Sequence, residues 1–411
     1  MNQSPLTHTL TNGLRIIHMP SDSPISYAGF AVNVGTRDED ADTFGLAHFA
    51  EHMLFKGTAK RKAWHILNRM ENVGGELDAY TTKEETFVYS TFMEEHFPRA
   101  FDLLSDLVFH SRFPQHEIDK EVDVILDEIS SYEDSPSELI FDEFENLLFK
   151  NHALGHHILG NKESLLTFTT ETGTNFLHQF YTPQNMIFFS MGRTPFSRIV
   201  KRAESALSTL SLPATPHCRT APQPYELAEI ITEEKDTHQA HVLIGCQSLG
   251  LHDARRTPLF LLNNLLGGPG MNSRLNIALR EKHGLVYNIE SNTTPYSDTG
   301  VASIYFGTSP KNRTKAIRLV HQELDKLRQT PLNERQLAAI KKQSIGQLAI
   351  ASDNSESRFL GMGKSFLHFN HYESQSELYE RINSSTAETL LQIAQEVYNP
   401  KRLLTLIYDE Q

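Results

Sequence analysis

Residues 43–57 read Thr-Phe-Gly-Leu-Ala-His-Phe-Ala-Glu-His-Met-Leu-Phe-Lys-Gly, and the interpretation of the whole chain depends on this stretch. Its apolar residues recur at the three- and four-residue spacing of an amphipathic helix, and Gly57 marks the end. On such a helix His48 and His52 lie one turn apart on one face, with Glu51 beside them. Two neutral imidazoles suit a zinc ion, and a neighbouring carboxylate can accept a proton from a water molecule on the metal. The stretch therefore predicts a zinc-binding helix that carries its own general base.

The five-residue pattern alone leaves chance open, because the chain contains 20 histidines. A third ligand is needed, and a later helical segment offers two carboxylates. Glu121 and Glu128 are seven residues apart and so share one helix face, while Val122, Ile125 and Leu126 form an apolar stripe on another. A solvated acidic face is the alternative for this segment.

The surrounding sequence predicts strands interleaved with pairs of helices. We expect strands over 14–18, 27–34, 76–82 and 86–92, and helices over 63–73, 95–111, 116–132 and 137–149. Because strands and helices do not alternate strictly, this order favours an α+β domain with a largely antiparallel sheet.

A proline-rich, aperiodic stretch lies close to the midpoint of the 411 residues. We predict an N-terminal domain over 1–208, a linker over 209–224 and a C-terminal domain over 225–411. The two halves resemble each other weakly, since 52–57 aligns with 263–268. In this alignment the positions of the motif's first histidine, its glutamate and its second histidine are filled by Leu259, Leu262 and Asn263, respectively. The second domain is therefore predicted to bind no metal.

The HxxEH pattern, followed at a distance by the E-x6-E pair, resembles the pitrilysin (M16) family of zinc metallopeptidases, which includes insulin-degrading enzyme and the mitochondrial processing peptidase. The resemblance implies one Zn²⁺ per chain on His48, His52 and Glu128, with Glu51 activating a water molecule and Glu121 supporting catalysis from nearby. It also implies an α+β fold of two homologous domains, each a mostly antiparallel sheet packed with helices, which together form half of a clam shell.

Two further segments of the first half match this family. Residues 74–81, Gly-Gly-Glu-Leu-Asp-Ala-Tyr-Thr, resemble its GGxxNAxT strand, which implies that Ala79, Tyr80 and Thr81 bind substrate as an added β-strand. An ordinary hairpin is the alternative, and Asp78 departs from the usual Asn, which leaves its role open. Residues 151–160 resemble a structural loop of the family, so we expect no second metal site on their three histidines.

The second half adds a glycine-rich segment over 265–275 and an R-x6-Y element, both similar to family segments. The resemblance implies that Arg280 and Tyr287 bind substrate and stabilise the developing oxyanion; a charged helix end with a packed Tyr is the alternative. In large family members this element serves the zinc of the opposite half of the clam shell. A chain of this length with both motifs is therefore expected to form a homodimer that shares its active sites.

The predicted function is zinc-dependent hydrolysis of peptides or unfolded segments inside an enclosed chamber, as an endopeptidase or oligopeptidase. A precursor-processing peptidase with a partner subunit and a non-catalytic scaffold subunit of the same family are the alternatives. The net charge of −13 argues against a nucleic-acid partner. No apolar run suggests a membrane span, and no targeting segment is evident at the N-terminus, so we expect a cytoplasmic protein.

Overall fold

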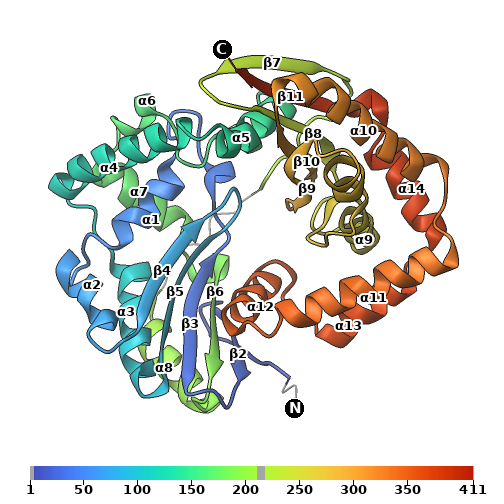
Figure 1. The fold of residues 1–411 in the computed structure, drawn as a ribbon. Coiled ribbons are helices and arrows are strands. Elements are labelled where there is room, and N and C mark those ends of the chain that lie inside the picture. The colour runs from blue at the N-terminus through green and yellow to red at the C-terminus, as the bar shows by residue number, and fades with distance from the viewer. Residues whose placement is uncertain (1–3, 211–217, 411) are drawn as a thin grey trace. The chain divides into compact units, whose positions relative to one another are not determined.

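The computed structural model describes residues 4–210 and 218–410, and its contacts divide the chain into two compact units (Figure 1). Unit 1 comprises Met1–Ile129, His156–Arg219 and Ser352–Glu373. Unit 2 comprises Ser130–Gly155, Thr220–Ala351 and Ser374–Gln411. Each unit contains one mixed, mostly antiparallel sheet packed with helices, so the predicted two-domain α+β fold is confirmed. The predicted linker over 209–224 includes residues 211–217, which lie outside the described residues, and the predicted boundaries at 208 and 225 stay a prediction.

The sheet of unit 1 has six strands in the order β1-β2-β6-β3-β5-β4. The strands are β1 (Leu6–Thr9), β2 (Arg15–Pro20), β3 (Ile25–Val32), β4 (Glu76–Thr81), β5 (Thr86–Met93) and β6 (Met186–Gly192). Only β2 and β6 pair in parallel. Strand β4 pairs with β5 alone and forms one edge of the sheet.

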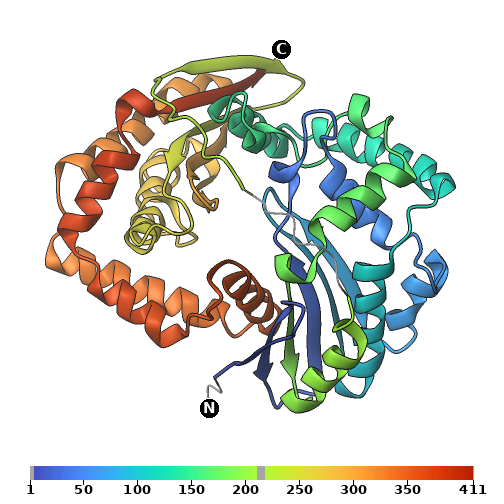
Figure 2. The same cartoon turned by 180° about the vertical axis from the view of Figure 1, so that it is seen from behind.

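Helices cover both faces of this sheet. They are α1 (Leu46–Leu54), α2 (Ala63–Glu71), α3 (Phe97–His110), α4 (Gln115–Glu133), α6 (Lys162–Leu165), α7 (Thr170–Phe180), α8 (Phe196–Leu207) and α12 (Ser355–Phe369). The larger apolar core joins one face to helices that include α1 and α3. On the other face, Phe359, Met362 and Phe366 of α12 pack against β-strand residues, and Figure 2 shows this helix from behind. A segment from late in the sequence therefore completes the unit that contains the N-terminus.

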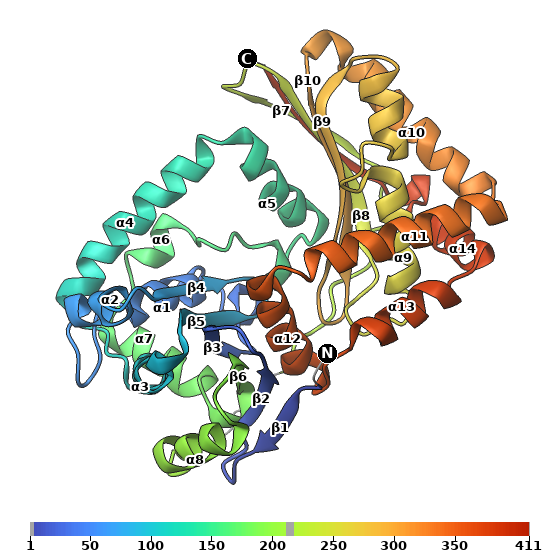
Figure 3. The same cartoon turned by 60° about the horizontal axis from the view of Figure 1, so that its bottom comes forward.

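The sheet of unit 2 has five strands in the order β7-β11-β8-β10-β9. The strands are β7 (Ile230–Lys235), β8 (Ala240–Ser248), β9 (Val286–Pro295), β10 (Gly300–Thr308) and β11 (Leu404–Glu410). The helices are α5 (Pro136–Leu148), α9 (Arg256–Gly267), α10 (Pro310–Gln329), α11 (Glu334–Ala351), α13 (Gln375–Ser384) and α14 (Ala387–Val397). Helix α5 packs on β8 and β11, on the face opposite to α10 and α14 (Figure 3). None of the helices among the described residues combines the length and apolarity needed to cross a bilayer.

The two sheets repeat one chain path. In unit 1 the chain runs β2, β3, α1, β4, β5 and later β6, and in unit 2 it runs β7, β8, α9, β9, β10 and later β11. In each sheet the first of these strands pairs in parallel with the last, and every other pairing is antiparallel. The expected internal duplication is therefore visible as the same topology in both units.

Candidate metal centre

Helix α1 carries the HxxEH pattern, and it begins at Leu46 rather than at the expected Thr43. The preceding Gly45 has a φ of 90°, a left-handed conformation that favours glycine. The carboxylate of Glu39 accepts hydrogen bonds from the backbone N–H of Gly45 at 2.8 Å and of Ala47 at 2.7 Å. A carboxylate at a helix N-terminus satisfies unpaired N–H groups and interacts favourably with the helix dipole. The start of the metal helix is thus fixed by a residue outside the motif.

The structure brings together the three predicted zinc ligands. The rings of His48 and His52 on α1 have centroids 4.5 Å apart. From α4, Glu128 Oε2 lies 3.9 Å from Nε2 of His48 and 3.8 Å from Nε2 of His52. The candidate ligand atoms all lie within 4.8 Å of one another, and no other such group of His, Cys, Asp or Glu side chains is found in the described part of the chain. Ligands of one tetrahedral zinc ion are about 3.4 Å apart, so small side-chain movements allow this set to hold the ion.

The protonation of both histidines follows from their surroundings. Burial, reinforced by the neighbouring His52, lowers the pKa of His48 to about 3, so this imidazole is neutral and available as a ligand. Burial acts in the same direction on His52, but the hydrogen bond to Glu121 and the charge of this carboxylate outweigh it and raise the pKa of His52. A metal cation bound by Nε2 of His52 would displace the second ring proton, which the raised pKa favours.

Glu121 is buried, and both of its carboxylate oxygens have partners on other side chains. Its Oε1 lies 2.9 Å from Nδ1 of His52, and its Oε2 lies 2.5 Å from Nζ of Lys56. Burial raises the pKa of Glu121, but the hydrogen bonds to His52 and Lys56 outweigh it and lower this pKa. A carboxylate is a usual second partner of a metal-bound histidine. With Glu121 on Nδ1, Nε2 of the ring is left for the metal. Lys56 was not predicted from the sequence; it lies four residues after His52, just beyond the C-terminal end of α1.

Glu51 shares α1 with the histidines and is 9% exposed. Burial raises the pKa of its carboxyl group, and the nearby Thr81 hydroxyl partly offsets that effect. Its Oε2 has no hydrogen-bond partner among the described residues. A buried carboxylate with a raised pKa and an unused oxygen is suited to accept and return a proton.

Strand β4 passes beside α1 and presents its free edge. Leu77 and Ala79 pack on the core that contains α1, whereas Tyr80 faces the other side and stacks on Phe87 with ring centroids 4.9 Å apart. Of the three predicted substrate-binding residues, Ala79 and Thr81 thus face the metal helix with their side chains. The side chain of Tyr80 points to the opposite face of the sheet.

Asp78, the departure from the family pattern, also lies on the Tyr80 side of the sheet. Its Oδ1 accepts the N–H of Ala79 at 2.8 Å, and its Oδ2 accepts the hydroxyl of Tyr89 at 3.1 Å. The same hydroxyl lies 3.0 Å from Glu356 of α12. The carboxylate therefore caps a backbone N–H of the edge strand.

Arg280 and Tyr287 belong to unit 2, whereas the metal cluster belongs to unit 1. Arg280 lies in a π-helical turn, Asn276–Glu281, and Tyr287 lies on the edge strand β9 with 88% of its surface exposed. The guanidinium carbon lies 5.7 Å from the centroid of the Tyr287 ring, a cation–π contact. The R-x6-Y element thus forms one exposed pair.

The histidine-containing loop over 151–160 supports α1. The ring of His156 stacks on Phe44 at 3.6 Å, and a Cβ placed on Gly45 would lie only 2.7 Å from Cα of Gly160. The loop also holds Lys83, whose ammonium group donates to the carbonyl of His156. These contacts hold the loop against the segment that leads into α1.

Comparisons with known proteins converge on one family. The family description "Insulinase (Peptidase family M16)" matches residues 16–162, and "Peptidase M16 inactive domain" matches residues 167–344. An uncharacterized zinc protease of Bacillus subtilis is 31% identical over 97% of each chain, and one of Streptomyces coelicolor is 30% identical over 97% of this chain and 88% of its own. Among solved structures, a protease from Helicobacter pylori shares the fold with a TM-score of 0.91, at 19% identity over 99% of each chain. A peptidase M16 inactive domain from Pseudomonas fluorescens also has a TM-score of 0.91, at 18% identity, covering 100% of this chain and 98% of its own. With two M16 domains in sequence and full-length relatives of this kind, the chain belongs to the pitrilysin-type M16 family of peptidases.

Proposed function

We propose that this M16 protein is a zinc-dependent endopeptidase that cleaves peptides or unfolded segments. The observation that carries the proposal is the convergence of His48, His52 and Glu128, whose ligand atoms lie within 4.8 Å of one another. Glu51 on the same helix supplies the base, and the free edge of β4 supplies a place for an extended substrate. The zinc-protease names of the relatives agree with this chemistry.

In the proposed reaction, His48, His52 and Glu128 would hold a zinc ion, which would supply Lewis acidity to lower the pKa of a water molecule and to polarise the scissile carbonyl. Glu51 accepts the proton of the attacking water and returns it to the leaving amine. Glu121 keeps Nε2 of His52 directed at the ion, and Lys56 keeps Glu121 ionised and in place. Tyr287 and Arg280 are proposed to bind the substrate and to stabilise the developing oxyanion.

Substrate binding is proposed to occur by strand addition to β4. In the register of β4 and β5 the backbone groups of alternate residues point to the free edge, so the added strand is read mainly through its amides. Such a mode accepts many sequences, as expected of an oligopeptidase.

Replacement of Glu51 by Gln tests the proposal. We expect Glu51→Gln to retain zinc, because Glu51 is not among the ligands, and to lose on the order of 10³-fold or more in peptide turnover, because a proton acceptor is removed. Metal analysis and a quenched-peptide assay, with and without a chelator, measure both. A wild-type chain that binds zinc but cleaves no peptide would favour the scaffold alternative, and full turnover by Glu51→Gln would exclude this base.

We also propose that two copies of the chain share their active sites and enclose the chamber between them. The proposal rests on the fact that Arg280 and Tyr287 belong to unit 2, whereas the ligands belong to unit 1. Mixing Glu51→Gln with Tyr287→Phe, each nearly inactive alone, is then expected to restore up to about a quarter of the activity, because half of the sites in a mixed dimer are intact. A lack of recovery despite subunit exchange shown by mass spectrometry would contradict sharing.

A further inference from the structure

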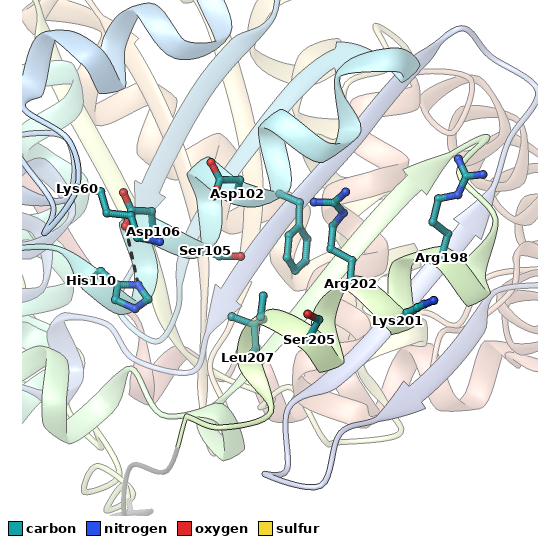
Figure 4. A pocket seen from close by; sticks show the side chains of 12 residues that line it. Lys60, Asp102, Ser105, Asp106, His110, Arg198, Lys201, Arg202, Ser205 and Leu207 are labelled. Carbon is teal, nitrogen blue, oxygen red and sulfur yellow. Dashed lines mark ion pairs between the residues drawn. The ribbon is translucent and has the colours of Figure 1, made fainter.

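A cavity of about 430 Å³ lies in unit 1 between α3 and α8, and it contains none of the metal-cluster residues (Figure 4). Three basic residues of α8 line it at the i, i+3, i+4 spacing of one helix face, namely Arg198, Lys201 and Arg202. Lys60, which follows α1, and His110, the last residue of α3, line it from the other side. The cavity therefore gathers cationic groups from two separate segments and an imidazole from a third.

Among the described residues, the acidic side chains of the cavity form no ion pair with Lys60 or with the α8 cations, although Asp106 Oδ1 lies 3.9 Å from Nδ1 of His110 (Figure 4). Asp102 and Asp106 of α3 both form ion pairs with Arg61, and Asp106 also accepts the Thr58 hydroxyl at 2.6 Å. Within the described parts of the chain, the three α8 cations form no ion pair. A chain with a net charge of −13 thus keeps a local excess of positive charge at one concave site.

A buried hydroxyl group points to a ligand at the same place. Ser105 lines the cavity and is only 7% exposed, and its Oγ has no hydrogen-bond partner among the described residues. Figure 4 shows this hydroxyl directed into the space between α3 and α8. Buried hydroxyl groups are nearly always hydrogen-bonded, because an unsatisfied one carries its full desolvation cost. An acceptor that enters the cavity would satisfy Ser105.

We propose that this cavity binds a small anion with two or more phosphate groups. Guanidinium groups bind phosphate oxygens in a bidentate manner, the ammonium groups of Lys60 and Lys201 add charge, and Ser105 donates a hydrogen bond to an oxygen of the anion. The volume falls in the range of small-molecule sites. This site is independent of peptide hydrolysis, so it stands or fails separately from the proposed function.

Isothermal titration with inorganic tripolyphosphate as the probe tests the site on the full zinc-loaded chain. We expect one tripolyphosphate per chain, with an affinity that falls as salt is raised. The double variant Arg198→Gln/Arg202→Gln should lose at least about tenfold in affinity. Arg318→Gln, which removes an exposed arginine on α10 of unit 2, is the matched control and should stay within about twofold of wild type. Tripolyphosphate can also extract zinc, but this effect is common to all variants, and metal analysis measures it.

The hydroxyl group has its own comparison. Ser105→Ala should weaken tripolyphosphate binding about three- to tenfold, whereas Ser273→Ala, which removes an equally buried and unpartnered hydroxyl in unit 2, should not change it. The proposal is overturned if wild type does not bind tripolyphosphate at this site, or if the arginine pair and its control lose affinity equally.

Discussion

Helices α1 and α9 occupy the same step of the chain path in two units of one topology, yet only α1 carries metal chemistry. On α1, His48, Glu51 and His52 lie on the side of the helix near the carboxylate of Glu128. In the alignment of the two halves, α9 carries Leu259, Leu262 and Asn263 instead, and all three are buried. The shared topology shows that the fold does not depend on metal ligands, since the second unit forms its sheet and helices without them.

The second unit uses the equivalent position for packing. Asn263 donates from Nδ2 to the carbonyl of Ser291 on β9 at 2.7 Å, and the Ser291 hydroxyl donates to Asn263 Oδ1. These bonds tie α9 to an adjacent strand, as the contacts of α1 with β4 do in the first unit. The description of the C-terminal match as an inactive domain agrees with this replacement. The difference between the units is thus one of side-chain chemistry on a common frame.

The largest expected effect comes from giving α1 the residue of α9. His52→Asn removes one of the three ligands and the partner of Glu121, so the chain is expected to lose stoichiometric zinc. Peptide turnover should fall on the order of 10³-fold or more. Metal analysis and the quenched-peptide assay measure the two quantities.

A matched histidine change separates the site from a general effect. His178→Asn alters an exposed histidine of α7 in the same unit and should leave zinc content and turnover unchanged. The reverse change in unit 2, Asn263→His, should not create a zinc site, because leucines fill the neighbouring positions. Full zinc binding by His52→Asn would contradict the ligand assignment.

A smaller effect is expected from Glu121→Gln. The amide keeps the shape of the side chain but loses the charge that holds the proton on Nδ1 of His52 and pairs with Lys56. Zinc affinity should fall about 10- to 100-fold, the usual cost of losing such a partner. Competition with a chromophoric chelator measures it. An unchanged zinc affinity together with lost turnover would instead place Glu121 in direct contact with the substrate.

Much of the local structure was predictable from the sequence, because the relevant patterns are short. The periodicity of residues 43–57 predicted a helix, and the glycines at 74 and 75 preceded a predicted strand; the structure confirms both elements as α1 and β4, with α1 beginning three residues later than expected. The resemblance gave the ligand set that the structure gathers, while the catalytic roles of these residues stay a prediction.

Long-range packing could not be predicted in the same way. The apolar residues of α12 have helical spacing, but nothing in that spacing says that the helix packs in unit 1. The same holds for α5, which comes from the first half and packs on the sheet of unit 2. Glu39 was missed as the cap of α1 because it binds the helix across an irregular loop, where no periodicity marks it. Contacts between distant segments carry no local sequence pattern that would reveal them.

The smallest expected effect tests the packing role of the second helix. Asn263→Ala removes both hydrogen bonds to Ser291 and leaves a buried carbonyl and hydroxyl without their partner, so the free energy of unfolding of unit 2 should fall by about 1–3 kcal/mol. Zinc content should not change, because the cluster lies in unit 1. Asn292→Ala, at the exposed neighbouring position of β9, is the control and should cost less than about 0.5 kcal/mol. Urea unfolding followed with metal analysis measures both quantities. An equal loss of stability in the two variants would show that the hydrogen bonds of Asn263 do not stabilise unit 2, whereas a selective loss would show that the α9 position aligned with the ligand His52 carries a structural hydrogen-bond pair.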